Sequence, residues 1–164
     1  MTNTLPSLWT LWFHSPTESG WDITSYKKVY EIKTLDDFWQ VYNRMTDTIV
    51  ENGMFFLMRG TIFPMWEDTK NKNGGCWSFK IYKKYIPNTW IDLSIHTVAE
   101  TVCSNSKLIT GISISPKKSF SIIKIWNSDA NKNSNKLLTD KIEHMARWAV
   151  GDAEGAGGCK QCFL

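Results

Sequence analysis

The stretch that most constrains the fold is a polar, glycine-ended loop that lies between two apolar runs. It covers residues 64–75 and reads PMWEDTKNKNGG. Pro64 fixes its own φ and biases Phe63 towards an extended conformation, and the closing glycine pair permits a turn with positive φ. The apolar runs on either side, residues 54–59 and 75–83, have the composition of strands. The loop is therefore predicted to join two strands.

Within this loop, Trp66 directly precedes two carboxylates, Glu67 and Asp68. An exposed indole beside a carboxylate can hold a flat base that is electron-poor above its plane and rich in N–H donors along one edge. A 7-methylated guanine is such a base, because its positive ring would stack on the indole and its N1–H and N2–H₂ groups would donate to one carboxylate. The alternative is a tryptophan that caps a hairpin core while both carboxylates are solvated.

The composition indicates a single domain with a small positive charge. The chain has 164 residues, 42% of them hydrophobic, which is enough to bury a core, and we expect the domain to cover residues 1–150. A formal net charge of +3 is too small for a protein that wraps a duplex, but it suits a site for a few phosphates. The nine tryptophans can serve as core residues, interface anchors or base-stacking surfaces.

The four cysteines do not form a spaced disulfide framework, which favours the reducing cytoplasm. Cys159 and Cys162 form a C-x-x-C motif within residues 151–164, a glycine-rich tail that is expected to be flexible. Because no second cysteine pair or histidine cluster accompanies this motif, we expect neither a zinc site nor a redox site there. No apolar run approaches the ~18 residues needed to span a bilayer, so no membrane association is expected.

Hydrophobic periodicity predicts strands interleaved with helices. The predicted strands are residues 8–14, 27–32, 54–59, 75–83, 108–115 and 120–126. The predicted helices are residues 34–45, 88–102 and 136–150. This order indicates an α+β fold, in which a curved, mainly antiparallel sheet carries the helices on its convex face and loops at the other.

The first predicted helix carries more apolar surface than one buried stripe requires. Thr34 supplies a capping hydroxyl, and Leu35 and Trp39, four residues apart, share one face. The other face consists of Phe38, Val41, Tyr42 and Met45. One face is predicted to pack in the core and the other to dock a partner. The alternative is that Trp39 is itself a core residue.

The tryptophans, including Trp21 after the loop of residues 15–20, follow the pattern of a known family. The motifs that carry the pattern are Trp9-x-x-Trp12-Phe13, Trp21, Asp37-Phe38-Trp39-x-x-Tyr42-Asn43, Pro64-Met65-Trp66-Glu67-Asp68 with Asn71 and Gly74-Gly75, Trp77, Trp90 and Ile125-Trp126. The pattern resembles that of the eukaryotic translation initiation factor 4E family, whose members bind the 5′ cap of mRNA.

This resemblance implies a fold like a cupped hand and a defined base site. It implies that Trp21 and Trp66 sandwich the methylated guanine, that Glu67 accepts its N1 and N2 protons, and that Trp126 lies near the 7-methyl group. On the convex side, it implies that a helix of an initiation factor 4G-like scaffold or of a 4E-binding protein lies on an apolar patch. The residues that match this patch are Leu35, Trp39 and Ile91.

The sequence departs from the family at the positions that, by the resemblance, would bind the triphosphate of the cap. Cys76 stands where the family usually has arginine, and Ile122 stands where it has lysine, whereas Lys117 matches a phosphate-binding arginine. Because alternate residues of a strand share a face, a lysine two positions after Ile122 is a candidate substitute. The predicted phosphate ligands are Lys117, Lys124 and Lys118. The alternative is that these lysines are only solvated surface.

The expected function is to bind the 7-methylguanosine cap of mRNA and link it to a scaffold protein in translation initiation, as a cytoplasmic monomer. The alternative is a cap-binding repressor, or a divergent homologue, that does not recruit the initiation machinery. An enzyme is not expected, because the three histidines are dispersed along the sequence and no nucleophile–base pair or metal cluster is evident. For the same reason no metal or cofactor is expected.

Overall fold

The computed structural model of the chain describes residues 3–142 and 160–161. These residues form one antiparallel sheet with the strand order β2-β1-β3-β5-β6-β4-β7. The strands are β1 (Thr4–His14), β2 (Tyr26–Thr34), β3 (Met54–Arg59), β4 (Gly75–Tyr82), β5 (Ile109–Pro116), β6 (Phe120–Asn127) and β7 (Lys160–Gln161). Each predicted strand is present, and the predicted α+β class with an antiparallel sheet is confirmed.

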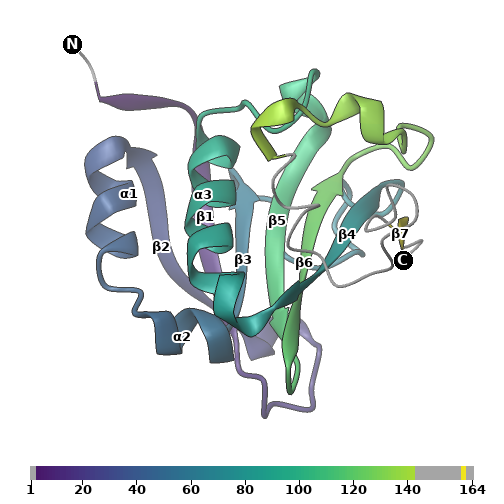
Figure 1. The fold of residues 1–164 in the computed structure, drawn as a ribbon. Coiled ribbons are helices and arrows are strands. Elements are labelled where there is room, and N and C mark those ends of the chain that lie inside the picture. Colours follow the sequence, from purple (N-terminus) through teal and green to yellow (C-terminus); the bar gives the residue numbers. More distant parts are fainter. Residues whose placement is uncertain (1–2, 143–159, 162–164) are drawn as a thin grey trace.

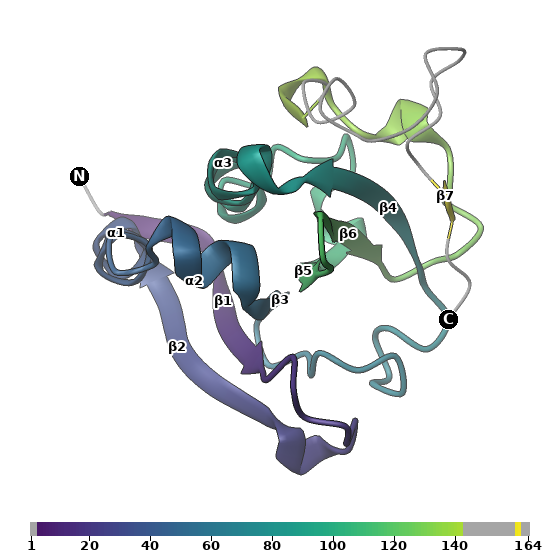
Figure 2. The ribbon, with the colours of Figure 1, turned by 60° about the horizontal axis from the view of Figure 1, so that its bottom comes forward.

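Three α-helices lie on one face of this sheet. They are α1 (Leu35–Tyr42), α2 (Asp47–Asn52) and α3 (Ile86–Val98). Figure 1 shows them in front of the strands, and Figure 2 shows the β1–β2 and β3–β4 loops on the opposite side. The two faces of the sheet are therefore available for different tasks.

The third helix predicted for residues 136–150 is wrong over its described part. Two 3-10 turns, Asn135–Leu137 and Asp140–Ile142, replace it, and residues 143–150 lie outside the described chain. The cause is tertiary pairing, because the Leu137 carbonyl accepts from the Ser104 amide at 2.8 Å and Thr139 donates its amide to Val102. These bonds engage backbone groups that a helix would use internally.

Helix α2 was not predicted from the sequence, and α1 begins as predicted. The Thr46 hydroxyl caps α2, but Val50 is its single buried residue, so the segment lacks an apolar periodicity. At α1, the Thr34 hydroxyl accepts from the Asp37 amide, and the Asp37 carboxylate accepts in return from the Thr34 amide. This capping box fixes the direction in which α1 leaves β2.

The central strand β3 is buried on both faces, and its alternation divides the core in two. Phe55 and Leu57 belong to the main core, which lies between the sheet and the helices. A smaller cluster on the opposite face contains Met54, Phe56, Met58 and Trp126. This second cluster supports the face of the sheet that carries the loops.

A partly buried ion pair ties β3 to the turn after α3. The Arg59 guanidinium pairs with the Glu100 carboxylate, donates to the Ile109 carbonyl at 2.8 Å, and lies 4.6 Å from the centre of the Trp9 ring. The Glu100 carboxylate also accepts from the Ser7 hydroxyl at 2.6 Å. Because each side chain is only 18% exposed, removing one partner would leave the other charge poorly compensated.

We predict that this pair makes the fold sensitive to acid. Burial raises the pKa of Glu100. Hydrogen bonds from Ser7 and Arg59 and the charge of Arg59 together lower this pKa by a larger amount, so the net pKa lies below its ordinary value of 4.5. The pair therefore stabilises the fold above pH 4.5, and this contribution is lost as pH falls through the lowered pKa.

Urea unfolding between neutral and acidic pH measures this dependence. Glu100→Gln should be less stable at neutral pH and should lose less free energy of unfolding on acidification than the parent protein. Asp140→Asn, at an exposed carboxylate, is the matched control. Its free energy of unfolding should change with pH as that of the parent protein does. An acid dependence that is equal in the parent and in Glu100→Gln would contradict the prediction.

Candidate functional site

The face of the sheet opposite the helices carries a cleft of about 390 Å³. Its walls come from the β1–β2 loop, the β3–β4 loop and strands β2, β3, β5 and β6. The side chains that the sequence analysis singled out and that line it are Trp21, Trp66, Glu67, Lys124 and Trp126. The fold therefore gathers into one cavity residues that are as much as 105 positions apart in the chain, from position 21 to position 126.

Trp21 enters the cleft from the end of the β1–β2 loop. Its side chain is 53% exposed, and it stacks on the His14 ring with 4.2 Å between ring centres and 9° between planes. The next residue, Asp22, caps a short 3-10 turn by accepting from the Thr24 amide at 2.8 Å. The indole is thus an exposed plane on a supported backbone.

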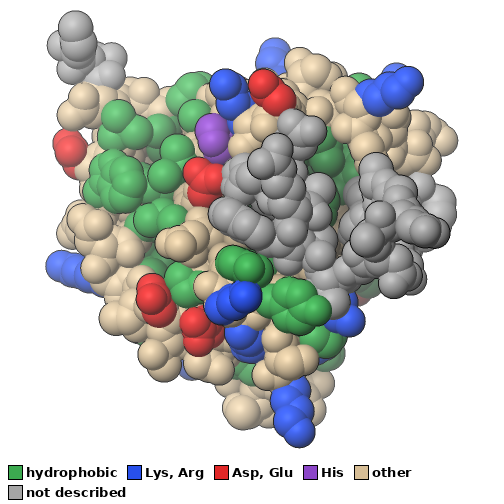
Figure 3. Space-filling view, viewed as in Figure 1, with side chains coloured by type: hydrophobic (Ala, Val, Ile, Leu, Met, Phe, Trp, Pro, Cys, Tyr) green, Lys and Arg blue, Asp and Glu red, His purple; other side chains and the backbone are tan. Residues whose placement is uncertain are grey.

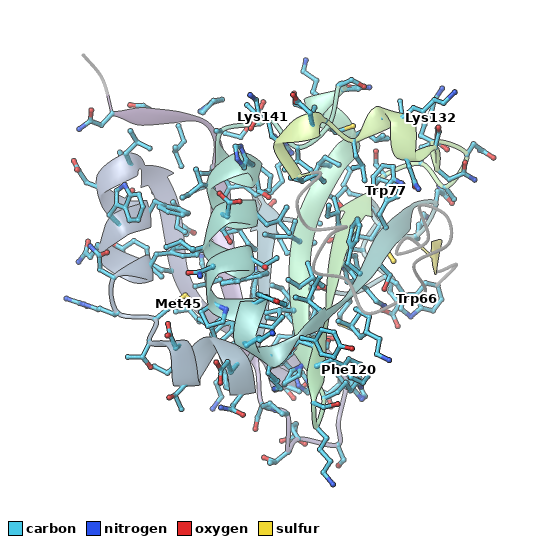
Figure 4. All side chains as sticks on the ribbon, in the orientation of Figure 1. Met45, Trp66, Trp77, Phe120, Lys132 and Lys141 are labelled. Atoms are coloured by element: carbon cyan, nitrogen blue, oxygen red, sulfur yellow. The ribbon has the colours of Figure 1, made fainter. Side chains whose placement is uncertain are left out.

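Trp66 and Glu67 enter from the β3–β4 loop, and both are exposed. The buried Asn71 side chain holds this loop, because its amide donates to the carbonyls of Phe63 and Met65 at 3.1 and 2.8 Å. Asp68 accepts from the Phe63 amide at 2.9 Å. In Figure 4, Trp66 lies at the β4 end of the sheet, away from α1. The predicted loop between two strands is confirmed.

The glycine pair at the end of this loop has a different role from the predicted one. Among the described glycines, Gly60 alone has a positive φ, of 56°. A Cβ atom on Gly74 would instead lie 1.8 Å from the Asn127 carbonyl oxygen. The Gly75 amide donates to the Asn127 side chain at 3.1 Å. Gly74 is therefore required by close approach of two backbones, which local turn rules do not reveal.

Trp126 forms a wall of the cleft and is not an exposed stacking surface. Its side chain is 6% exposed, and its indole N–H donates to the Ser113 hydroxyl at 2.9 Å. Its ring centre lies 6.3 Å from that of Phe56, in an edge-to-face arrangement. Only part of this indole can meet a ligand, which fits a contact with a small group and not a full stack.

Five further residues line the cleft and were not identified from the sequence: Tyr26, Met54, Phe56, Ser113 and Ser115. Burial raises the pKa of Tyr26 to about 12, and the negative charge of Glu67 contributes to this rise. The phenol therefore stays neutral beside the carboxylate. The alternation within β3 and β5 shows which residues share a face, but it does not show which face is the cleft.

The three predicted phosphate ligands are placed differently. Lys124 lines the cleft, whereas Lys117 and Lys118 are exposed in the β5–β6 turn and do not line it. Ser115, two residues before Lys117, does line the cleft, so the turn leaves from its edge. Cys76 is buried in β4, where it pairs in register with Trp126. Because a thiol carries no positive charge, this residue cannot replace the arginine of the family as a phosphate ligand.

The three residues of the predicted partner patch lie on the helix face. Leu35 and Trp39 are 46% and 42% exposed, and Ile91 is half-buried against the main core. Apolar side chains gather on this face over α1 and α3 (Figure 3). Core burial of Trp39, the alternative interpretation, is excluded by its exposure. We call Leu35, Trp39 and Ile91 the convex patch.

Two negative observations apply to the described part of the chain. None of its helices is long and apolar enough to cross a membrane. Within residues 3–142 and 160–161, no group of three or more His, Cys, Asp or Glu side chains is arranged to hold a metal ion. Cys159 and Cys162 lie outside the described residues, as does most of the predicted flexible tail. Lys160–Gln161 pairs with Trp77 and Ser78 as β7.

The fold and the cleft together define an α+β domain in which two loops present indoles beside a carboxylate. The family model of eukaryotic initiation factor 4E matches residues 4–150, and the chain belongs to this family. It is 27% identical to eukaryotic translation initiation factor 4E-2 of Schizosaccharomyces pombe over 147 residues, covering 86% of the chain and 59% of that relative.

A second relative is eukaryotic translation initiation factor 4E1 of Drosophila melanogaster, with 29% identity over 152 residues that cover 89% of the chain and 57% of the relative. The chain thus spans less than two thirds of the length of either relative.

Among solved structures, the complex of C. elegans eIF4E-3 with the 4E-binding protein Mextli has a TM-score of 0.77 and 22% identity, covering 94% of this chain and 90% of that one. Ascaris suum eIF4E-3 with m7G cap has a TM-score of 0.75 and 23% identity, covering 90% and 84%. These neighbours share the fold.

Proposed function

We propose that the chain binds the 7-methylguanosine cap of mRNA and links it to a scaffold protein in translation initiation, acting in the cytoplasm and without catalysis. The observation that carries this proposal is the meeting of Trp21, Trp66 and Glu67 in one cleft. Membership of the initiation factor 4E family supports it, as does the fold shared with a protein solved with m7G cap.

In this proposal the base lies between the two exposed indoles. The methylated ring is positive, so stacking on Trp21 and Trp66 gains cation–π energy that unmethylated guanine lacks. The Glu67 carboxylate accepts the N1 and N2 protons in charge-assisted hydrogen bonds. Trp126 contacts the 7-methyl group from the wall, and Lys124 binds the phosphate nearest the cleft.

The convex patch is the proposed scaffold site. Leu35 and Trp39 are large apolar side chains in contact with solvent, on helix α1 and away from the cleft loops. An amphipathic helix can lay its apolar face on such a surface. The shared fold with a relative solved with the 4E-binding protein Mextli supports a partner of this kind, either a 4G-like scaffold or a 4E-binding protein.

A titration of tryptophan fluorescence with 7-methyl-GTP and, in parallel, with GTP tests the base site. We expect 7-methyl-GTP to quench the fluorescence and to bind at least about tenfold more tightly, because a desolvated cation–π contact is worth about 2 kcal/mol. Recovery of unchanged nucleotide after incubation tests the absence of catalysis. Equal affinity for the two nucleotides would contradict the proposed function.

The phosphate ligands can be separated by their positions. Lys124→Ala should lower the preference for 7-methyl-GTP over 7-methyl-GMP and reduce the salt slope by about one charge. Lys117→Ala and Lys118→Ala should lower the same preference and salt slope by smaller amounts, since neither side chain lines the cleft.

Affinities measured over a salt series provide the data for these variants. Lys141→Ala is the control, because this exposed lysine lies beside α3 on the other side of the sheet (Figure 4). A preference that stays unchanged in Lys124→Ala and Lys117→Ala would show that other groups hold the phosphates.

A further inference from the structure

His14, the last residue of β1, lies directly beneath the indole of Trp21. Its side chain is fully buried, whereas that of Trp21 is 53% exposed. The two rings are stacked, with 4.2 Å between centres and 9° between planes. The Tyr26 ring, on β2, packs against the imidazole in an edge-to-face arrangement, with 5.0 Å between ring centres. One face of the indole is therefore supported by a ring that is itself held in the sheet.

Both nitrogens of His14 contact the backbone of the loop that leads to Trp21. Nδ1 lies 2.9 Å from the Ser15 carbonyl oxygen, and Nε2 lies 2.8 Å from the Gly20 carbonyl oxygen. These carbonyls belong to the first and last residues of the loop of residues 15–20. A neutral imidazole donates to one of them, and a protonated imidazole donates to both. The same ring thus closes the loop and supports the indole that follows it.

We propose that His14 is a positioning residue for cap binding, which holds Trp21 in the ligand-free protein with its open face towards the base site. This inference rests on the proposed function. The loop forms hydrogen bonds within itself, for example from the Gly20 amide to the Glu18 carboxylate at 3.1 Å. These bonds hold the loop backbone, whereas the stack on His14 holds the plane of the indole. Ordering one side chain only when the ligand binds would weaken affinity by about three- to tenfold.

Phenylalanine at this position would stack on Trp21 but could not bond to either carbonyl. A small residue would do neither. His14→Phe and His14→Ala therefore separate the two contributions, and His14→Phe also keeps the buried volume if His14→Ala fails to fold. His96→Ala is the matched control, because His96 lies on α3, on the opposite face of the sheet.

The test is a double-mutant cycle with Trp21→Ala, in which calorimetry measures the affinity for 7-methyl-GTP. In the parent background, His14→Ala should weaken binding by about three- to tenfold and His14→Phe by less. In the Trp21→Ala background, neither change should weaken binding further, because His14 acts through that indole. His96→Ala should leave affinity unchanged. Equal losses in both backgrounds, or none in the parent background, would overturn the proposal.

A second measurement does not depend on the ligand. In the nucleotide-free protein, the indole N–H signal of Trp21 in a ¹H–¹⁵N spectrum should be single and dispersed, and it should broaden or shift towards the unfolded position in His14→Ala. An unchanged Trp21 signal would overturn the positioning role even if affinity fell. A parent protein that fails to prefer 7-methyl-GTP over GTP would instead contradict the proposed function, so the two failures can be distinguished.

Discussion

Trp66→Ala is expected to lose most of the affinity for 7-methyl-GTP while the protein keeps its stability. The indole is 48% exposed, so its removal opens no cavity in the core. Asn71 and Asp68 hold the loop through the backbone of Phe63 and Met65, and these bonds remain in the variant. Loss of one stack should cost about 1–3 kcal/mol, or about 5- to 150-fold in affinity.

Calorimetry measures this loss, since the substitution removes one of the fluorescent side chains. Trp77→Ala is the matched contrast, because Trp77 is 1% exposed and its truncation should lower the free energy of unfolding by about 3–5 kcal/mol. The same substitution thus acts on binding at one tryptophan and on stability at the other. A Trp66→Ala variant that binds 7-methyl-GTP like the parent would refute the proposed sandwich.

Trp39→Ala should abolish scaffold binding and leave cap affinity unchanged. Trp39 is 42% exposed on α1, and the cleft lies on the other face of the sheet. Tryptophans at the centre of an interface often contribute 2 kcal/mol or more, so affinity for a helical partner peptide should fall by about 30-fold or more. The two proposed functions should therefore be separable by single substitutions.

Binding of a peptide with the pattern Tyr-x-x-x-x-Leu-apolar, measured beside 7-methyl-GTP binding on the same sample, tests this separation. Ile49→Ala is the control, since Ile49 is a similarly exposed apolar residue on α2, outside the convex patch. Unaltered capture of the peptide by folded Trp39→Ala would refute the patch. A joint loss of peptide and nucleotide binding would show instead that Trp39 supports the whole fold.

Some features of the fold depend on near neighbours in the chain, and these were predictable. The strands β3, β5 and β6 lie within a residue or so of their predicted bounds, because alternation over a few residues is a local property. The capping hydroxyl of Thr34 and the loop that carries Trp66 and Glu67 follow from short patterns in the same way. The sequence therefore contained the principal residues proposed for the base site.

Other features depend on what packs against a segment. Periodicity cannot show that Trp21 and Trp66 are exposed while Trp9 and Trp77 are buried, since burial is decided by the elements that cover each side chain.

The same reason explains why residues 136–142 formed turns bonded to the segment after α3, and why Lys124 but not Lys117 lines the cleft. It also explains why the contacts of His14 could not be predicted from the sequence. Its stack on Trp21 and its contacts with two loop carbonyls arise only when the β1–β2 loop folds back over the end of its strand. By itself the sequence determined the main strands, the start of α1 and the residues that carry the chemistry, and the tertiary structure decided the remaining helices and turns and which of these side chains meet.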